Sequence, residues 1–111
     1  MIYEKFELVV LPFPFSDSLD QKKRPALVVS ANSFNSTAKH IVVGMVTTAK
    51  RSQWPLDIAI SDLDAAGLAV PCIVRMKFFT ADHRLILRKL GRLSPEDQQR
   101  VQSGLSELFA I

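Results

Sequence analysis

Short apolar tracts alternate along the chain with polar segments rich in Gly, Pro, Asn or Ser, at intervals of about 8 to 12 residues. The tracts are rich in β-branched and aromatic residues, which fit a pleated, half-buried surface. They predict about six strands, at residues 6–13, 24–31, 40–48, 55–60, 70–79 and 85–93. This spacing of strands and turns favours a small, strongly curved barrel of mainly β structure.

The end of the chain changes from a strand period to a helix period. Ser94 is a typical N-cap residue, and Pro95 suits the first helical position. Val101, Leu105 and Leu108 then recur at spacings of four and three residues, which places them on one face of a helix. The pattern predicts a single C-terminal amphipathic helix.

The segments between the predicted strands differ in character. Residues 61–67 begin with Ser and end with Gly, which predicts a single helical turn. Residues 31–39 are rich in Asn and Ser and predict a turn-forming loop. The polar loop 14–23 is longer than a tight hairpin needs, and such loops often carry function. A second exposed loop, 49–54, is basic.

Length and composition limit the class of protein. The chain has 111 residues, of which 48% are apolar and 23% charged, and we expect one domain over residues 1–111. The net charge of +3 tolerates a polyanionic partner without requiring one. Without a signal peptide or an apolar run of about 20 residues, we expect a cytoplasmic protein with no membrane association. The single cysteine, Cys72, lies in an apolar tract and is expected to be a small buried hydrophobe.

The second and third predicted strands bring two polar groups together. If these strands form an antiparallel hairpin, the centre of their loop places Arg24 opposite Thr47 and Ala31 opposite His40. Opposed residues share a face of a sheet, whereas a slip of one residue would separate them. A guanidinium and a hydroxyl are therefore predicted to meet at one end of the barrel, beside the two long loops.

Each of these residues also has a purely structural interpretation. Arg24 is either a functional group or a rim cation paired with Asp17 or Asp20 of the preceding loop. Thr47 also suits a strand for its shape alone. Arg75 interrupts an apolar tract, and an arginine inside a strand needs a carboxylate partner or an anionic ligand.

Other chemical signals are weaker. Trp54 either stacks on a nucleic-acid base or caps the core. His40 and His83 have no ligand-type neighbours at the usual spacings, so no metal site is expected. The sequence also lacks a Gly-rich loop of the kind that binds nucleotide phosphates.

Five segments, in this order and in a chain of this size, resemble the MazF/PemK family of toxins from bacterial toxin–antitoxin modules. They are VVLPFPFSD, KKRPALVVS, VTT, GLAVPCIVR and DHRLILRKLGRLSPED. The resemblance implies an SH3-like barrel with a C-terminal helix, a homodimer and a cognate antitoxin. It also implies a metal-independent endoribonuclease, without a cofactor, that cuts single-stranded RNA such as mRNA at short sequences.

The resemblance also implies roles for particular residues. The catalytic Arg and Thr of the family correspond to Arg24 and Thr47. Some members use an Arg followed two places later by an Asp as acid and base, and Arg75 matches the first of these. The second position is Lys77, which leaves the general base open. We favour Asp17, because its loop leads to Arg24. The alternatives for this base are Glu7, Asp20 and His83.

Metal-free RNA cleavage most simply uses the substrate's own 2′-hydroxyl as the nucleophile, which yields a 2′,3′-cyclic phosphate and a 5′-hydroxyl. Arg24 suits stabilisation of the phosphorane because its planar fork can hold two phosphoryl oxygens, and Thr47 can add a hydrogen bond. Cationic and aromatic side chains are expected to bind the RNA: Phe15, Lys22, Lys23, Lys50, Arg51, Trp54 and Lys77. The antitoxin is expected to cover this basic rim with a flexible acidic segment.

Two alternative functions use the same barrel. The first is a module that binds RNA or a peptide without cutting it, an alternative that stays open because residue 77 is a lysine and not an acid. The second is a toxin of the same barrel class that acts on DNA gyrase, whose activity would depend on the C-terminal residues 109–111. The resemblance centres on the segment around Arg24 rather than on the C-terminus, which favours the nuclease.

Overall fold

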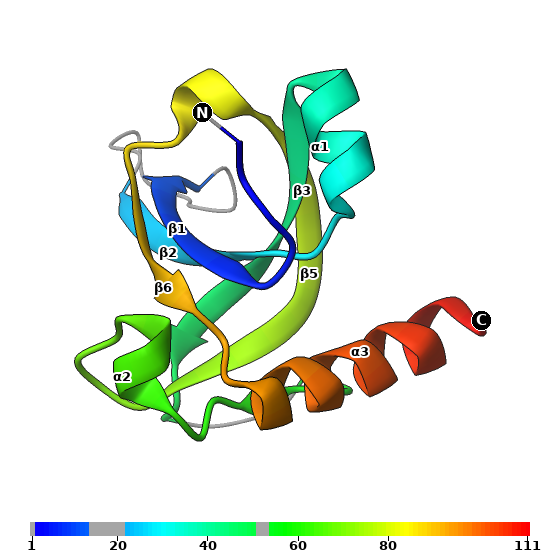
Figure 1. The fold of residues 1–111 in the computed structure, drawn as a ribbon. Helices are drawn as coiled ribbons and strands as arrows, with labels where there is room; N and C mark the ends of the chain where they lie inside the picture. The colour runs from blue at the N-terminus through cyan, green and yellow to red at the C-terminus, as the bar shows by residue number, and fades with distance from the viewer. Residues whose placement is uncertain (1, 14–21, 51–53) are drawn as a thin grey trace.

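A computed structural model describes residues 2–13, 22–50 and 54–111. Within these residues six strands form one curled antiparallel sheet in the order β4-β5-β3-β2-β1-β6 (Figure 1). The strands are β1 (Glu7–Pro12), β2 (Lys23–Val28), β3 (His40–Thr48), β4 (Ile58–Ala59), β5 (Cys72–Asp82) and β6 (Arg88–Arg92). The predicted mainly β fold, with a small curved sheet and a C-terminal helix, is confirmed.

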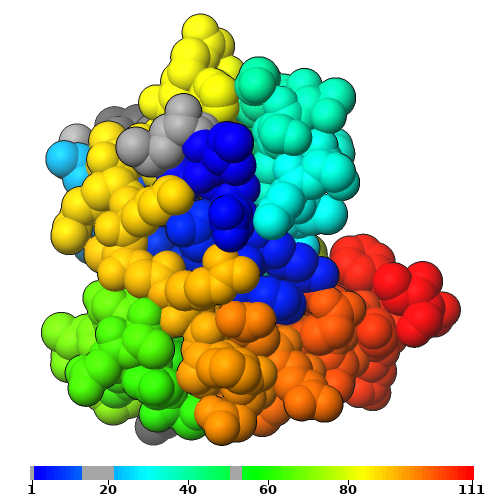
Figure 2. Space-filling view, in the orientation of Figure 1, coloured from blue at the N-terminus to red at the C-terminus, as the bar shows by residue number. Residues whose placement is uncertain are grey.

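Helices cover parts of this sheet. They are α1 (Asn32–Ala38), α2 (Leu63–Ala66), α3 (Pro95–Phe109) and a short 3₁₀ helix, η1 (His83–Leu85). The predicted start of the C-terminal helix is confirmed, because the Ser94 side chain accepts a hydrogen bond from the Asp97 N–H and Pro95 is the first helical residue. In Figure 2, α2 and α3 lie next to each other along one edge of the molecule, while α1 lies apart from them.

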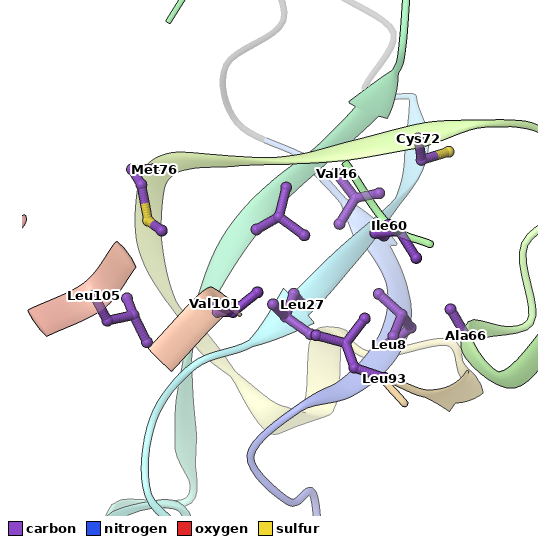
Figure 3. Packing of buried hydrophobic residues seen from close by; sticks show 11 residues of the cluster. Leu8, Leu27, Val46, Ile60, Ala66, Cys72, Met76, Leu93, Val101 and Leu105 are labelled. Carbon is purple, nitrogen blue, oxygen red and sulfur yellow. The ribbon is translucent and has the colours of Figure 1, made fainter. Parts of the chain in front are cut away.

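Hydrophobic side chains pack on both faces of the sheet because neighbouring strand residues point in opposite directions. One cluster joins Leu8, Leu27 and Val46 of the sheet to Val101 of α3 and Ala66 of α2 (Figure 3). The other cluster takes the alternate strand residues, among them Val9, Leu11, Ala26, Val28 and Val43. Burial of each such Leu or Val side chain contributes about 1.5 to 3 kcal/mol. The strands are therefore fixed from both sides.

The predicted register between β2 and β3 is confirmed where the two strands pair. Ala26 lies opposite Met45, and Val28 lies opposite Val43. The same register, continued toward the start of β2, brings Arg24 opposite Thr47. The ladder ends at Val28, so the predicted pair between Ala31 and His40 does not form.

The predicted loop at residues 31–39 is wrong, because residues 32–38 form α1. This helix has a polar sequence, and a buried polar residue holds it in place. The Asn35 amide donates hydrogen bonds to the carbonyl oxygens of Tyr3, at 2.9 Å, and Ser30, at 3.2 Å. Because Tyr3 is 32 residues away in the sequence, local Asn and Ser content alone favoured a loop.

Several predicted boundaries are also wrong. The fourth strand has two residues instead of six, because residues 54–57 form a turn. The fifth strand continues to Asp82, and η1 then occupies the start of the predicted sixth strand. Ser61 does not cap α2, since Asp62 accepts the capping hydrogen bond from the Ala65 N–H.

The outer end of α3 differs from its predicted apolar face. Val101 and Leu105 are buried, as predicted, but Leu108 is 40% exposed. Figure 1 shows the reason, because the last turns of α3 extend away from the sheet toward the C-terminus. The helical period is therefore right, while the covered length of the helix is shorter than the pattern suggests.

Gly67 allows α2 to pack closely against β6. This residue ends α2 in the left-handed conformation, with φ at 74°, as its predicted role as a helix stop requires. A Cβ atom at Gly67 would lie 2.1 Å from the carbonyl oxygen of Leu90. Backbone conformation and close contact thus both require glycine here, and residues 68–70 are positioned directly beyond it.

A buried carboxylate links α3 to the segment that leads into α2. The Asp97 side chain is 1% exposed and accepts hydrogen bonds from the N–H groups of Ser61 and Asp62, the Ser61 hydroxyl and the Arg100 guanidinium. Burial raises the pKa of Asp97, but these hydrogen bonds outweigh burial and lower the pKa to about 2. Asp97 is therefore charged in the folded protein throughout the neutral range.

We predict that Asp97→Asn lowers the free energy of unfolding by about 2 kcal/mol at pH 7. In the unfolded chain this carboxyl has an ordinary pKa of 3.8, so the unfolded state binds more protons between pH 3.8 and about 2. The contribution of Asp97 is complete above that window and is lost as the pH falls through it. Urea unfolding at pH 7, 4 and 2.5 measures the narrowing difference between wild type and variant.

The exposed neighbour Glu96, varied to Gln, provides the control for this prediction. This substitution removes one acidic charge from the same turn of α3 without removing a buried hydrogen-bond acceptor. We expect only a small, nearly pH-independent change. A difference between wild type and Asp97→Asn that stays constant from pH 7 to 2.5 would contradict the assigned role of Asp97.

Candidate functional site

Two cavities adjoin at the end of β3 and share Thr47 and Thr48. The larger, of about 530 Å³, is also lined by Lys50 and Arg75. The smaller, of about 210 Å³, is also lined by Arg24. Its remaining lining residues are Pro25, Val46, Leu68, Ala69, Val70 and Cys72. Three of the four residues for which sequence analysis predicted catalysis, Arg24, Thr47 and Arg75, thus line these two adjoining cavities, whereas Asp17 lies outside the described residues.

The sheet explains why these side chains share a face. Ala26 pairs with Met45, which in turn pairs with Arg75 of β5. Arg24 lies two residues before Ala26 on β2, and Thr47 lies two residues after Met45 on β3. Because side chains alternate along a strand, both point to the same face as Ala26, Met45 and Arg75. Thr47 lies on the central strand of the three, so the two arginines flank it from β2 and β5. Neighbouring strands are about 4.8 Å apart, which is within reach of long side chains.

Arg75 has the carboxylate partner that its position inside a strand requires. Its Nε donates to Asp57 Oδ1 at 3.2 Å, and its Nη2 donates to Asp57 Oδ2 at 2.9 Å. The Asp57 side chain is 2% exposed, whereas the Arg75 side chain is 21% exposed. The hydrogen bond to Asp57 raises the pKa of Arg75, burial opposes this, and the attraction between the two charges adds to the rise. The guanidinium is therefore permanently charged.

Sequence analysis did not identify Asp57, although a signal for it existed. Arg75 needed an acid, and residues 55–60, the predicted neighbouring strand, contain only one acid, Asp57. The pairing of Ile58 with Val74 places this segment directly beside Arg75. An unpaired arginine and a single acid on adjoining strands would together have predicted the ion pair.

Trp54 packs against β5 next to this ion pair. Its indole Nε1 donates to the carbonyl oxygen of Met76 at 3.1 Å, while the residue is 43% exposed. The Lys77 Nζ lies 5.7 Å from the centre of the indole ring. Trp54 thus neither caps the core completely nor moves independently of the sheet, and it presents an anchored aromatic surface beside two cations.

The remaining predicted RNA-binding residues divide into two groups. Lys22, Lys23 and Lys50 are exposed, and Lys50 also lines the larger cavity. Phe15 and Arg51 lie outside the described residues. Asp17 and Asp20 lie outside them as well, so the predicted base and the predicted ion-pair partners of Arg24 are not tested.

Two alternative bases lie away from the cavities. His83 follows Asp82, which pairs with His40 at the opposite end of β3 from Thr47. The seven residue steps along β3 from His40 to Thr47 correspond to about 23 Å. Glu7 lies at the far end of β1 from Arg24 and forms an ion pair with Lys89 at 3.2 Å.

Cys72 matches its predicted role as a buried hydrophobe. It is 6% exposed and packs with the core between the sheet and α3 (Figure 3). Burial raises the pKa of its thiol, which disfavours the reactive thiolate.

Two classes of site lack support in the part of the chain that the structure describes. No group of three or more His, Cys, Asp or Glu side chains there could hold a metal ion. Among the same residues, no helix is long and apolar enough to span a membrane.

The family model for the PemK-like, MazF-like toxin of type II toxin–antitoxin systems matches residues 4–109. The chain belongs to this family. The match covers nearly the whole chain and confirms the resemblance of the five segments. No curated protein sequence matches the chain significantly.

Solved structures show the same fold at low sequence identity. MazF from Deinococcus radiodurans is 20% identical, with a TM-score of 0.76 and coverage of 100% of this chain and 99% of the other. An endoribonuclease in complex with its cognate antitoxin, from a mycobacterial species, is 17% identical, with a TM-score of 0.77 and coverage of 99% and 95%. The Mycobacterium tuberculosis toxin MazF-mt6 is 16% identical, with a TM-score of 0.74 and coverage of 95% and 97%.

We predict that Cys72 of this MazF-like protein reacts slowly with iodoacetamide in the folded state. Burial and the raised thiol pKa both lower the amount of accessible thiolate at pH 7.5. Mass spectrometry should show little alkylation of native protein during a period in which urea-unfolded protein is fully alkylated. Equal rates in both states would contradict the buried, structural role.

Proposed function

We propose that this protein is the toxin of a type II toxin–antitoxin system and a metal-independent endoribonuclease that cleaves single-stranded RNA, including mRNA. The observation that carries the proposal is the common position of Arg24, Thr47 and Arg75 on the walls of two adjoining cavities. Membership of the MazF-like toxin family supports it. The basic residues around the cavities suit a polyanionic substrate.

The proposed reaction begins with attack of the substrate's 2′-hydroxyl on the adjacent phosphorus. The bond between phosphorus and the 5′-oxygen then breaks, which yields a 2′,3′-cyclic phosphate and a 5′-hydroxyl. Arg24 holds the phosphoryl oxygens as negative charge concentrates on them, and Thr47 donates a hydrogen bond to the same group. Arg75 adds a second fixed positive charge from the opposite strand. Asp17 is the proposed base that accepts the 2′-hydroxyl proton, and a proton from solvent converts the departing 5′-oxygen into the 5′-hydroxyl.

Base recognition is proposed for the rim. Trp54 has an exposed ring that is anchored through its indole nitrogen, and single-stranded bases stack on such surfaces irrespective of sequence. The exposed cations Lys22, Lys23 and Lys50 attract the backbone phosphates. Phe15, Arg51 and Lys77 complete the proposed RNA-binding set.

An antitoxin partner and a homodimer form part of the proposal. Structures similar to this chain include MazE–MazF from Deinococcus radiodurans, at 18% identity and a TM-score of 0.77. We infer that an acidic flexible segment of an antitoxin covers the basic rim and competes with RNA. The proposed site of action is the cytoplasm.

We predict that Arg24→Lys keeps the fold and loses at least 100-fold in RNA cleavage, because lysine supplies charge without a planar fork. Wild type and variant are incubated with mixed-sequence RNA in EDTA. The fragments are then analysed for 5′-hydroxyl ends. Circular dichroism and urea unfolding confirm that the variant is folded.

Arg92→Lys provides the matched control for this substitution. Arg92 is the last residue of β6, lies away from the cavities and forms an exposed ion pair with Glu4. Its variant should therefore cleave RNA at the wild-type rate. Intact but gel-shifted RNA with wild-type protein would contradict the proposed nuclease and support a binding module. Full activity of Arg24→Lys would contradict the role of Arg24.

We also predict that RNA quenches the fluorescence of Trp54, the only tryptophan in the chain. Stacking of a base on the exposed ring provides the physical reason. Titration with single-stranded RNA carrying 2′-O-methyl groups, which prevent cleavage, measures the effect. Double-stranded RNA of the same length is the control, since its bases are already stacked. Equal signals with both RNAs would exclude base stacking on Trp54.

A further inference from the structure

The buried carboxylate of Asp57, which pairs with Arg75 of the larger cavity, has no role in the proposed reaction. Both oxygens of Asp57 accept hydrogen bonds from Arg75, and the acid itself is 2% exposed. A bidentate pair of this kind fixes the plane of a guanidinium as well as its position. Arg75 nevertheless lines the cavity together with Thr47. Asp57 therefore controls how one wall of the cavity presents its positive charge.

We propose that Asp57 is a positioning residue that holds Arg75 in the orientation required for RNA cleavage, an inference that rests on the proposed function. The Nε and Nη2 edge of Arg75 faces Asp57. The third nitrogen, Nη1, has no hydrogen-bond partner among the described residues and is left for a phosphoryl oxygen. Asp57 thus provides Arg75 with a carboxylate partner, which residue 77, a lysine, cannot provide.

The position of Asp57 is itself strongly constrained. Its backbone N–H donates to the carbonyl oxygen of Trp54 at 3.3 Å, and the Trp54 indole in turn donates a hydrogen bond to the carbonyl oxygen of Met76 on β5. Between them, Leu56 adopts a left-handed conformation with φ at 66°. Such a conformation is unfavourable for leucine and persists only where its surroundings fix it. The turn therefore presents the Asp57 carboxylate to Arg75 from a backbone with little freedom.

A stabilising ion pair and a positioning residue make different predictions for Asp57→Asn. The substitution keeps the volume of the side chain but removes its charge. The site then carries one more net positive charge, so binding of an RNA backbone does not weaken. Arg75, however, loses the charged acceptor that fixes its plane. A positioning role thus affects the rate of cleavage and spares affinity, whereas a purely structural role affects only the amount of folded protein.

The test compares Asp57→Asn with Asp97→Asn. Both substitutions remove an almost fully buried carboxylate bonded to an arginine, but Asp97 lies on α3, away from the cavities. Single-turnover cleavage at saturating mixed-sequence RNA gives the rate constant per folded molecule. Binding of 2′-O-methyl RNA gives the affinity. We expect Asp57→Asn to lose about 10- to 100-fold in rate with unchanged or tighter binding, and Asp97→Asn to match wild type in both.

A double variant tests whether Asp57 acts through Arg75. If it does, Asp57→Asn causes no further loss of rate once Arg75→Met is present, and the two losses are not additive. Additive losses would overturn the inference. A wild-type rate in Asp57→Asn, or an equal loss of rate in Asp97→Asn, would do so as well.

An NMR measurement separates this inference from the proposed nuclease activity. The Arg75 Nε–H signal, assigned by its absence from Arg75→Lys, should exchange slowly with solvent in wild type and rapidly in Asp57→Asn. Exchange in wild type as rapid as in free arginine would overturn the positioning role, whether or not the protein cleaves RNA. Protected exchange together with no cleavage by wild type would instead reject the nuclease proposal and the catalytic part of this inference, while retaining the fixed guanidinium.

Discussion

The antiparallel register between β2 and β3 decides where the groups of the candidate site lie. A shift of one residue would exchange the two faces of β2, moving Leu27 out of one core cluster and Ala26 out of the other. It would also turn Arg24 away from the face of Thr47. Because hydrophobic clusters pack against both faces of the sheet, such a shift would move buried side chains out of their cluster on each face. Core packing thus fixes the geometry of the site without contributing a polar group to it.

Two buried carboxylates then connect the remaining elements to this sheet. Asp97 is held mainly by backbone and hydroxyl donors, and it joins α3 to the segment before α2. Asp57 is held by a guanidinium that reaches a cavity. Charge burial is acceptable in both cases because the oxygens have hydrogen-bond partners, and no described buried side-chain nitrogen or oxygen lacks one. Of the two carboxylates, only Asp57 is held by a cation, Arg75, that lines one of the two cavities of the candidate site.

The sequence predicted those features that depend on local patterns. The alternation of apolar and polar residues predicted the strands of the sheet. Ser94 and Pro95 predicted the start of α3, and the centre of the hairpin between β2 and β3 predicted that Arg24 lies close to Thr47. They failed where distant partners decide. The polar helix α1 depends on contacts of Asn35 with Tyr3, and the exposure of Leu108 depends on how far the sheet extends beneath α3. The partner of Arg75 lay between these cases, since the need for an acid was visible but its source required knowledge of which strands adjoin.

The division between sheet and loops accounts for a shared fold at 16 to 20% sequence identity with solved MazF structures. A strand ladder requires alternating apolar residues and a correct register, and many sequences meet both conditions. The proposed chemistry requires only a few polar side chains at defined positions of that ladder. Identity over the whole chain therefore says little about the proposed activity, which depends on the relative positions of Arg24, Thr47 and the Arg75–Asp57 pair. Under the proposed function, the loops can then vary in sequence, and with them the recognised RNA, without disturbing the groups proposed to act on the phosphate.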